Sequence, residues 1–228
     1  SKEPYDGFRG RVMFPIKSVS GKVLAFGGRI LETASGDGPK YINSPESPIY
    51  EKGRNLYGLS RGKNPIRREG EALVVEGYVD AVSLAAAGFE NVVAPLGTAL
   101  TPEQARLLKR YTDRVLLLYD SDSAGLKATF KAGDVMLEAE VHPSVVTFPS
   151  GEDPDTYVRA HGPESTRALL KDSIDVMERK LQILEEKNYF SSIDRTRLAI
   201  DRLLPTLRAV RDHTLRDIYV GQVSEKTG

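Results

Sequence analysis

The chain has 228 residues, of which 40% are hydrophobic and 28% are charged, enough for one large domain or two small ones. It contains no Cys and 3 His, which excludes disulfide frameworks, thiolate nucleophiles and Cys/His zinc sites. No run approaches the roughly 18 apolar residues of a membrane span, and the start shows no signal-peptide pattern. Any metal would be held by oxygen, which favours magnesium or manganese.

The net charge is zero, but the charges are separated along the chain. Residues 1–68 hold 13 Lys and Arg against 6 Asp and Glu, whereas residues 69–160 hold 7 against 15. Residues 161–228 are close to neutral, with 12 against 11. This asymmetry suggests a basic part that holds phosphates and an acidic part that holds cations. Two solvated surfaces of opposite sign are the alternative.

The basic segment predicts two strands, at residues 11–16 and 22–31, joined by a turn at Ser20-Gly21. A polar stretch with Gly and Pro follows at residues 60–71, and we interpret it as a domain boundary. We therefore expect three parts: a basic N-terminal subdomain at 1–70, a central subdomain at 71–150, and a C-terminal part at 151–228.

From residue 72 the pattern alternates between short apolar strands and helices. The expected strands are 72–76, 91–96, 114–120 and 142–148, and the expected helices are 78–88, 101–111 and 123–140. This order predicts an α/β fold with a mainly parallel sheet covered on both faces. After Pro163 the pattern is helical, with helices at 163–171, 173–188, 192–203 and 206–220 and a break at Pro205.

Acidic residues gather where the predicted strands end. Glu76 closes the first strand and Asp120 closes the third, and further carboxylates follow nearby; the set is Glu76, Asp80, Asp120, Asp122, Asp153 and Asp155. Because parallel strands end at one edge of a sheet, we expect these side chains on one rim. Such oxygen ligands suit Mg²⁺, and two ions could clamp the oxygens of a phosphoryl transfer. For any single Asp, a helix N-cap or a turn is the alternative.

These residues resemble a known signature. The segments Glu76-Gly77-Tyr78-Val79-Asp80 and Asp120-Ser121-Asp122-Ser123-Ala124-Gly125 resemble Toprim, which bacterial primases, type IA and II topoisomerases and some nucleases share. The flanking segments are RGRVMFPI at 9–16, AFGGR at 25–29, KYINSPE at 40–46, KGRNLYGL at 52–59 and GEDPD at 151–155. Across roughly residues 5–160 they resemble the bacterial replicative primase, the DnaG family.

The resemblance implies a Toprim-type sheet between a basic α+β subdomain and a helical C-terminal subdomain. It implies an RNA primase core that makes short primers on single-stranded DNA from ribonucleoside triphosphates by divalent-metal-dependent nucleotidyl transfer. The six carboxylates above would bind Mg²⁺ or Mn²⁺, with Glu76, Asp120, Asp122 and Lys52 catalytic. The residues implied for nucleotide and template are Arg9, Arg11, Arg29, Lys40, Asn43, Lys52, Arg54, Gly77 and Tyr78.

The resemblance also implies partners and a location. Guanosine tetraphosphate would inhibit by binding the same basic residues, and the protein would act in the cytoplasm at the replication fork, without a membrane. Since the family's zinc-binding domain needs Cys, we expect a fragment without zinc. We also expect the helicase-binding domain to be missing, so that the replicative helicase and single-strand-binding protein act through regions not in this chain. The alternatives are another Toprim nuclease or topoisomerase, and a non-catalytic nucleic-acid-binding module.

Overall fold

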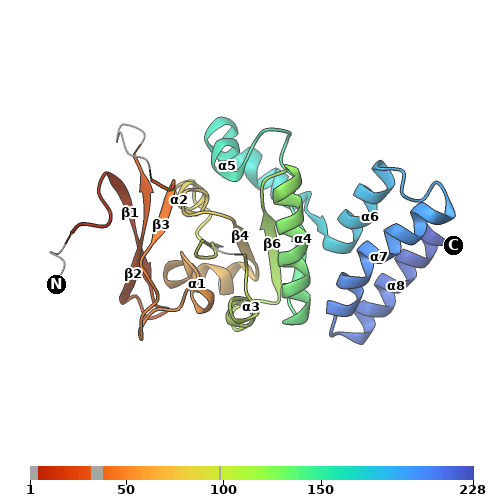
Figure 1. Cartoon of the computed structure of the whole chain (residues 1–228), viewed down its shortest axis with the longest axis horizontal. Coiled ribbons are helices and arrows are strands. Elements are labelled where there is room, and N and C mark those ends of the chain that lie inside the picture. The colour runs from red at the N-terminus through yellow and green to blue at the C-terminus, as the bar shows by residue number, and fades with distance from the viewer. Residues whose placement is uncertain (1–4, 32–37, 98) are drawn as a thin grey trace.

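The computed structural model describes residues 5–31, 38–97 and 99–228. Figure 1 shows three parts that follow one another along the long axis: a small sheet at the N-terminal end, a central sheet covered by helices, and a group of helices at the C-terminal end. Within these residues, no helix is both long and apolar enough to cross a membrane.

The N-terminal part is an antiparallel sheet in the order β1-β2-β3. Its strands are β1 (Arg11–Lys17), β2 (Val23–Ile30) and β3 (Tyr41–Asn43). The two predicted strands are confirmed, whereas the three-residue β3 carries too short a pattern to be predicted. On β1, Phe14 and Ile16 alternate with exposed residues, as a strand with one covered face requires. Their buried face packs against Tyr78 and Leu96 of the central part.

The polar stretch that we interpreted as a boundary is a helix. A short 3₁₀ turn, η1 (Lys52–Arg54), leads to α1 (Leu59–Glu69). Leu59 and Ile66 are buried in the core of the central sheet, and this burial offsets the lost hydrogen bond of Pro65 inside the helix. The polar residues of α1 form its outer face. The domain limits stay a prediction, but α1 packs on the central sheet although it precedes residue 70.

The central sheet has the strand order β5-β4-β6-β7-β8. Its strands are β4 (Ala72–Val75), β5 (Val92–Val93), β6 (Arg114–Leu118), β7 (His142–Val145) and β8 (Ile174–Asp175). The first four are parallel, and the unpredicted β8 is antiparallel to β7. The predicted α/β fold with a mainly parallel sheet is confirmed.

Helices cover both faces of this sheet (Figure 1). On one face α1, α3 (Pro102–Lys109) and α4 (Ser123–Glu138) share a core with β4 and β6. On the other face lie α2 (Tyr78–Ala86) and α5 (Pro154–Lys171). The expected N-terminus of α3 is confirmed, because Gln104 N donates to Thr101 Oγ1 at 3.2 Å and Thr101 N donates to Gln104 Oε1 at 3.0 Å.

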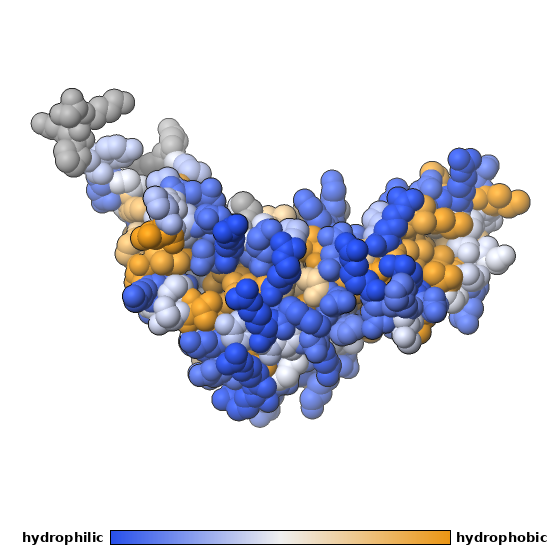
Figure 2. Space-filling model, turned by 90° about the horizontal axis from the view of Figure 1, so that it is seen from below, coloured by the Kyte–Doolittle hydropathy of each residue, from blue (hydrophilic) through white to orange (hydrophobic). Residues whose placement is uncertain are grey.

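The C-terminal part is helical, as predicted. It consists of α6 (Val176–Glu186), α7 (Ile193–Ala209) and α8 (His213–Thr227). The expected break at Pro205 is wrong, because α7 continues through it. Leu203 and Ala209 are buried on either side of Pro205, and their packing holds the helix together there. On the face that Figure 2 presents, hydrophobic residues gather at the N-terminal and C-terminal ends, and hydrophilic residues predominate between them.

Candidate active site

The candidate site lies where the strand order of the central sheet changes direction. From β4 the chain moves to β5 on one side and then to β6 on the other, so β4 and β6 are neighbours, with Val75 paired to Leu118. Glu76 follows directly after β4, and Asp120 stands two residues after β6. Ligands of open α/β sheets bind at such a switch point, outside the carboxyl ends of the strands.

The predicted carboxylates are brought together at this edge. A pocket of about 470 Å³ is bordered by five of them: Glu76, Asp80, Asp120, Asp153 and Asp155. An adjoining hollow of about 260 Å³ is bordered by Asp120, Asp122 and Asp153. Because the two hollows share Asp120 and Asp153, the six residues form one continuous acidic rim, as the sequence predicted.

Three of these carboxylates also accept hydrogen bonds from backbone amides. Asp122 Oδ1 accepts from Gly125 N at 2.6 Å, and Asp153 Oδ1 accepts from Thr156 N at 2.7 Å, so both cap helices. Asp80 Oδ2 accepts from Gly77 N at 3.2 Å. The capping role and the ligand role are compatible, because a carboxylate has a second oxygen that can face the pocket.

Asp155 is the most deeply buried of the six carboxylates, and two side chains hold it in place. It is 7% exposed; Ser83 Oγ donates to it at 2.5 Å, and Arg159 forms an ion pair with it. Sequence reasoning missed both partners. The four-residue spacing of Asp155 and Arg159 on a helix was a usable signal for one. Ser83 lies on α2, far away in sequence, and gave no signal.

The crowding of like charges raises the pKa values of the rim. Burial, followed by the charges of Asp153, Asp120 and Asp155, raises the pKa of Asp80 from 3.8 to about 7. Burial and the charge of Asp120 raise the pKa of Glu76. Burial and the charges of Asp153 and Asp122 raise the pKa of Asp120. The rim therefore resists full ionisation unless a positive charge compensates for it.

A divalent cation fits the chemistry of this donor set. The donors are all carboxylate oxygens, which Mg²⁺ and Mn²⁺ prefer. Among the described residues, no group of three or more His, Cys, Asp or Glu side chains is already arranged around one metal position. The carboxylates thus border a shared space without converging on one point.

The opposite wall of the pocket is basic and comes from the N-terminal sheet. Arg29, Lys40 and Asn43 border the same space as the carboxylates, as does Tyr41, whose ring lies 5.8 Å from the Arg29 guanidinium. These strands approach the acidic rim because Phe14 and Ile16 pack against Tyr78 and Leu96. Positive and negative charges therefore face each other across one pocket.

The other predicted basic residues do not border this pocket. Arg11 Nη1 donates to the carbonyls of Gly28 and Pro39 at 3.3 and 2.9 Å, so it braces the N-terminal sheet. Arg54 pairs with Glu51 at 3.0 Å. Arg9 and Lys52 are absent from the residues that line the pocket. The binding roles of these four, and the catalytic role of Lys52, stay predictions.

Tyr78 and Gly77, both predicted for the nucleotide site, border the same pocket. Tyr78 is 3% exposed, its ring stacks on Phe14 at 5.2 Å, and its hydroxyl donates to Asn43 Oδ1 at 2.6 Å. Asn43 Nδ2 in turn donates to Leu96 O at 3.3 Å. Tyr78 therefore positions Asn43, and its own role in nucleotide binding stays a prediction. A Cβ at Gly27 would stand 2.7 Å from the Tyr78 ring, so this contact requires glycine.

Three family models match successive parts of the chain. The N-terminal domain of the DNA primase catalytic core matches residues 1–63, a Toprim-like model matches residues 73–158, and the DnaB-helicase binding domain of primase matches residues 180–228.

Similar whole proteins and solved structures agree with these family models. A DNA primase of Clostridium acetobutylicum is 40% identical over 100% of the chain. A DNA primase domain from Pseudomonas aeruginosa has a TM-score of 0.88 and 37% identity over 98% of the chain and 70% of the solved one. The chain belongs to the bacterial DnaG-type DNA primase family.

Another solved structure of the primase family is described as a DnaG catalytic domain bound to single-stranded DNA. It has a TM-score of 0.86 and 38% identity over 98% of the chain and 71% of the solved one. The chain spans 37% of the length of the curated C. acetobutylicum relative. The match at residues 180–228 corrects one expectation, because the chain contains a segment that matches the helicase-binding domain of primases. The helices of this segment were predicted, but their sequence carries no motif that pointed to a helicase.

Proposed function

We propose that the chain is the catalytic core of a DNA primase, which makes short RNA primers on single-stranded DNA from ribonucleoside triphosphates. The observation that carries the proposal is the pocket itself, in which Arg29, Lys40 and Asn43 face the acidic rim. A nucleoside triphosphate needs cationic contacts for its phosphates, and a polymerase needs a carboxylate-bound cation beside them. Family membership supports the same reaction.

The metal would be Mg²⁺ or Mn²⁺, held by Glu76, Asp120 and Asp122, with Asp80 and Asp153 adjoining. When bound, such a cation neutralises phosphate oxygens and lowers the pKa of an attacking hydroxyl. The protein residues supply the rest. Arg29 and Lys40 hold the phosphates, and Asn43, fixed by Tyr78 and Leu96, offers its amide to the nucleotide. Asp155 is kept in place by Ser83 and Arg159 and shapes the wall.

The partners follow from the same surfaces. Phosphate contacts of the basic wall would make template binding tolerant of sequence and sensitive to salt. Guanosine tetraphosphate would compete with the triphosphate, because it offers the same polyphosphate charge to Arg29 and Lys40. We further propose that residues 180–228 contact the replicative helicase, supported by the matching family model. Contact with a single-strand-binding protein, and a location at the replication fork, stay predictions.

The test is ribonucleotide incorporation on single-stranded DNA with Mg²⁺ or Mn²⁺. Asp120→Asn is compared with Asp201→Asn, a matched change on the exposed face of α7. We expect template-dependent RNA from wild type and Asp201→Asn and none from Asp120→Asn. Cleavage of the nucleic acid without use of nucleotides would instead indicate a Toprim nuclease. Absence of both RNA synthesis and Asp120-dependent Mn²⁺ binding would indicate a non-catalytic binding module.

A further inference from the structure

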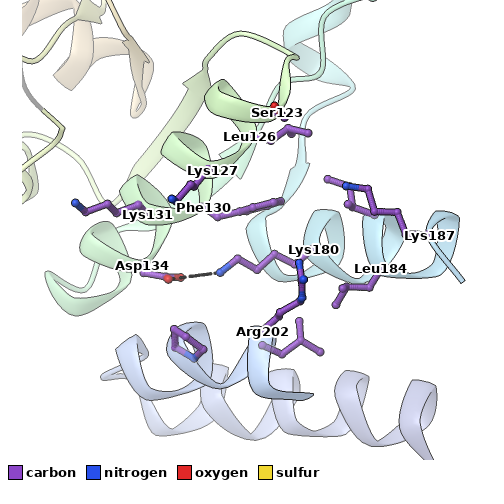
Figure 3. Close-up of a pocket in the computed structure, with 13 residues that line it drawn as sticks. Ser123, Leu126, Lys127, Phe130, Lys131, Asp134, Lys180, Leu184, Lys187 and Arg202 are labelled. Atoms are coloured by element: carbon purple, nitrogen blue, oxygen red, sulfur yellow. Dashed lines mark hydrogen bonds and ion pairs between the residues drawn. The ribbon is translucent and has the colours of Figure 1, made fainter. Parts of the chain in front are cut away.

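A second large hollow runs along α4, beginning at Ser123 beside the rim residue Asp122. It has a volume of about 690 Å³ and runs between α4 on one side and α6 and α7 on the other (Figure 3). Along α4 it extends from Ser123 to Asp134, which is about 17 Å of helix. None of the six rim carboxylates borders it, so it is a separate feature of the molecule.

The floor of this groove is apolar. Phe130 extends from α4 into the space between the helices (Figure 3), and the remaining floor residues are Leu126, Ile183, Leu184, Leu203 and Pro205. Phe130, Leu126 and Pro205 retain solvent-exposed surface, while Leu184 and Leu203 belong to the core of the C-terminal helices. This floor is apolar and open to water, so covering it with the apolar side of a ligand lowers the free energy.

The rim of the groove is basic. Lys127 and Lys131 stand on successive turns of α4, Lys187 follows the end of α6, and Arg202 extends from α7 (Figure 3). All four are exposed, and in the part of the chain that the structure describes none of them forms an ion pair. Arg202 lies over the Tyr189 ring at 4.8 Å, which keeps its charge in place.

Among the described residues that line the groove, Asp134 is the one carboxylate, and it already forms an ion pair. Asp134 Oδ1 lies 3.1 Å from Lys180 Nζ and accepts from Thr206 Oγ1 at 2.6 Å. Lys180 is 8% exposed and stands over the Phe130 ring at 5.1 Å. This buried pair ties α4 to α6 and α7 and leaves the charge presented to solvent by the groove positive.

We propose that this groove is a docking site for an acidic amphipathic helix of a partner protein. A helix with an apolar stripe would lay that stripe on Phe130 and Leu184, as in other helix-in-groove complexes. Acidic residues flanking the stripe would meet Lys127, Lys131, Lys187 and Arg202 on both sides. A nucleic acid fits less well, because the floor is mostly aliphatic, whereas bases are held by stacking on aromatic rings.

The test uses the whole chain and a designed probe, so it does not depend on the proposed primase activity. The probe is a fluorescein-labelled peptide of about 15 residues, with Leu at helical three- and four-residue spacing and Glu elsewhere. Three comparison probes are used: the same peptide with Lys for Glu, the same peptide with Ser for Leu, and a thymidine oligonucleotide of similar length. Fluorescence polarisation measures binding to each.

The matched variants are Lys127→Glu/Lys131→Glu in the groove and Lys171→Glu at the exposed end of α5. We expect the acidic peptide to bind wild type and Lys171→Glu equally, and the double variant about tenfold or more weakly, a difference of about 1.4 kcal/mol. The Lys and Ser peptides should bind at least about tenfold more weakly to wild type. Circular dichroism melting confirms that each variant is folded, since the changed residues are exposed.

Several results would overturn the proposal. One is equal binding of the acidic and basic peptides, and another is acidic-peptide binding that survives in the double variant. A third is the absence of acidic-peptide binding to the folded wild-type chain. If instead the oligonucleotide binds and loses affinity in the double variant, while the peptide does not bind, the groove is a nucleic-acid site.

Discussion

The two hollows beside α4 differ in how their charges are matched. In the carboxylate pocket, like charges crowd together behind the helix N-cap at Asp122, and their pKa values rise as a result. Among the described residues that line the groove, the only acid, Asp134, is paired with the buried Lys180, and the remaining cations are exposed. The difference teaches that like charges in the pocket call for a compensating cation, whereas the charges inside the groove are already paired and only its outer cations remain for a partner.

The largest expected effect is on catalysis in the pocket. Asp120→Asn removes a charge shared by both parts of the acidic rim while keeping the shape of the side chain. We expect primer synthesis to fall by roughly a hundredfold or more, because the cation loses a charged ligand. The same substitution at Asp134 in the groove should leave RNA synthesis per folded molecule within a factor of about two. Equal losses at both positions would abolish the distinction between the two hollows.

The next effect concerns the buried pair of the groove. Asp134→Ala leaves Lys180 buried without its carboxylate, so we expect the free energy of unfolding to fall by about 3–5 kcal/mol in urea titrations. The double variant Asp134→Leu/Lys180→Met removes both charges and should recover most of that loss. A loss below about 0.5 kcal/mol for Asp134→Ala would mean that Lys180 reaches water and that the pair does not hold the groove.

In the absence of metal, the stability of the protein should depend on pH, because the charges of the acidic rim are not compensated. Because the pKa of Asp80 is raised from 3.8 to about 7, the folded protein holds a proton there that the unfolded chain releases near pH 4. Stability should therefore fall as the pH rises through this window, by roughly 2–4 kcal/mol.

This pH effect has a matched control. Asp80→Asn should weaken the dependence of the melting temperature on pH in this window, since the group with the pKa of about 7 is gone while Glu76 and Asp120 still titrate. At pH 8 added Mg²⁺ should raise the melting temperature of wild type more than that of Asp80→Asn, because cation binding offsets the repulsion. A wild-type profile that is flat or rises with pH would contradict the raised pKa.

The smallest effect is expected at the rim of the groove. Lys131→Glu changes an exposed cation that forms no ion pair among the described residues, so its effect on the free energy of unfolding should stay within about 0.5 kcal/mol. Thermal melting checks this value. A loss of more than about 1 kcal/mol would show that Lys131 supports the fold, and would weaken its assignment to a docking rim.

Local patterns predicted the elements whose signals are short-range. The Thr101 and Gln104 capping box was visible in sequence, as were the apolar strand expected at 114–120 and the strand at 11–16. Patterns failed where tertiary packing overrides propensity. Pro65 and Pro205 lie inside helices because the residues around them are buried on neighbouring elements. The two-residue β8 is too short to show a sequence pattern, and it is recognised only by its antiparallel pairing with the edge of β7.

The sequence by itself determined the class of the fold and the acidic rim, because parallel strands with acids after their carboxyl ends deliver those acids to one edge whatever else packs around them. Only the tertiary structure decided which cations face that rim. Arg29 and Lys40 border the pocket whereas Arg11 and Arg54 do not, since the packing of Phe14 on Tyr78 sets how the N-terminal sheet approaches the rim. The groove likewise arises only when α4 meets α6 and α7, because residues distant in the sequence supply its floor and rim.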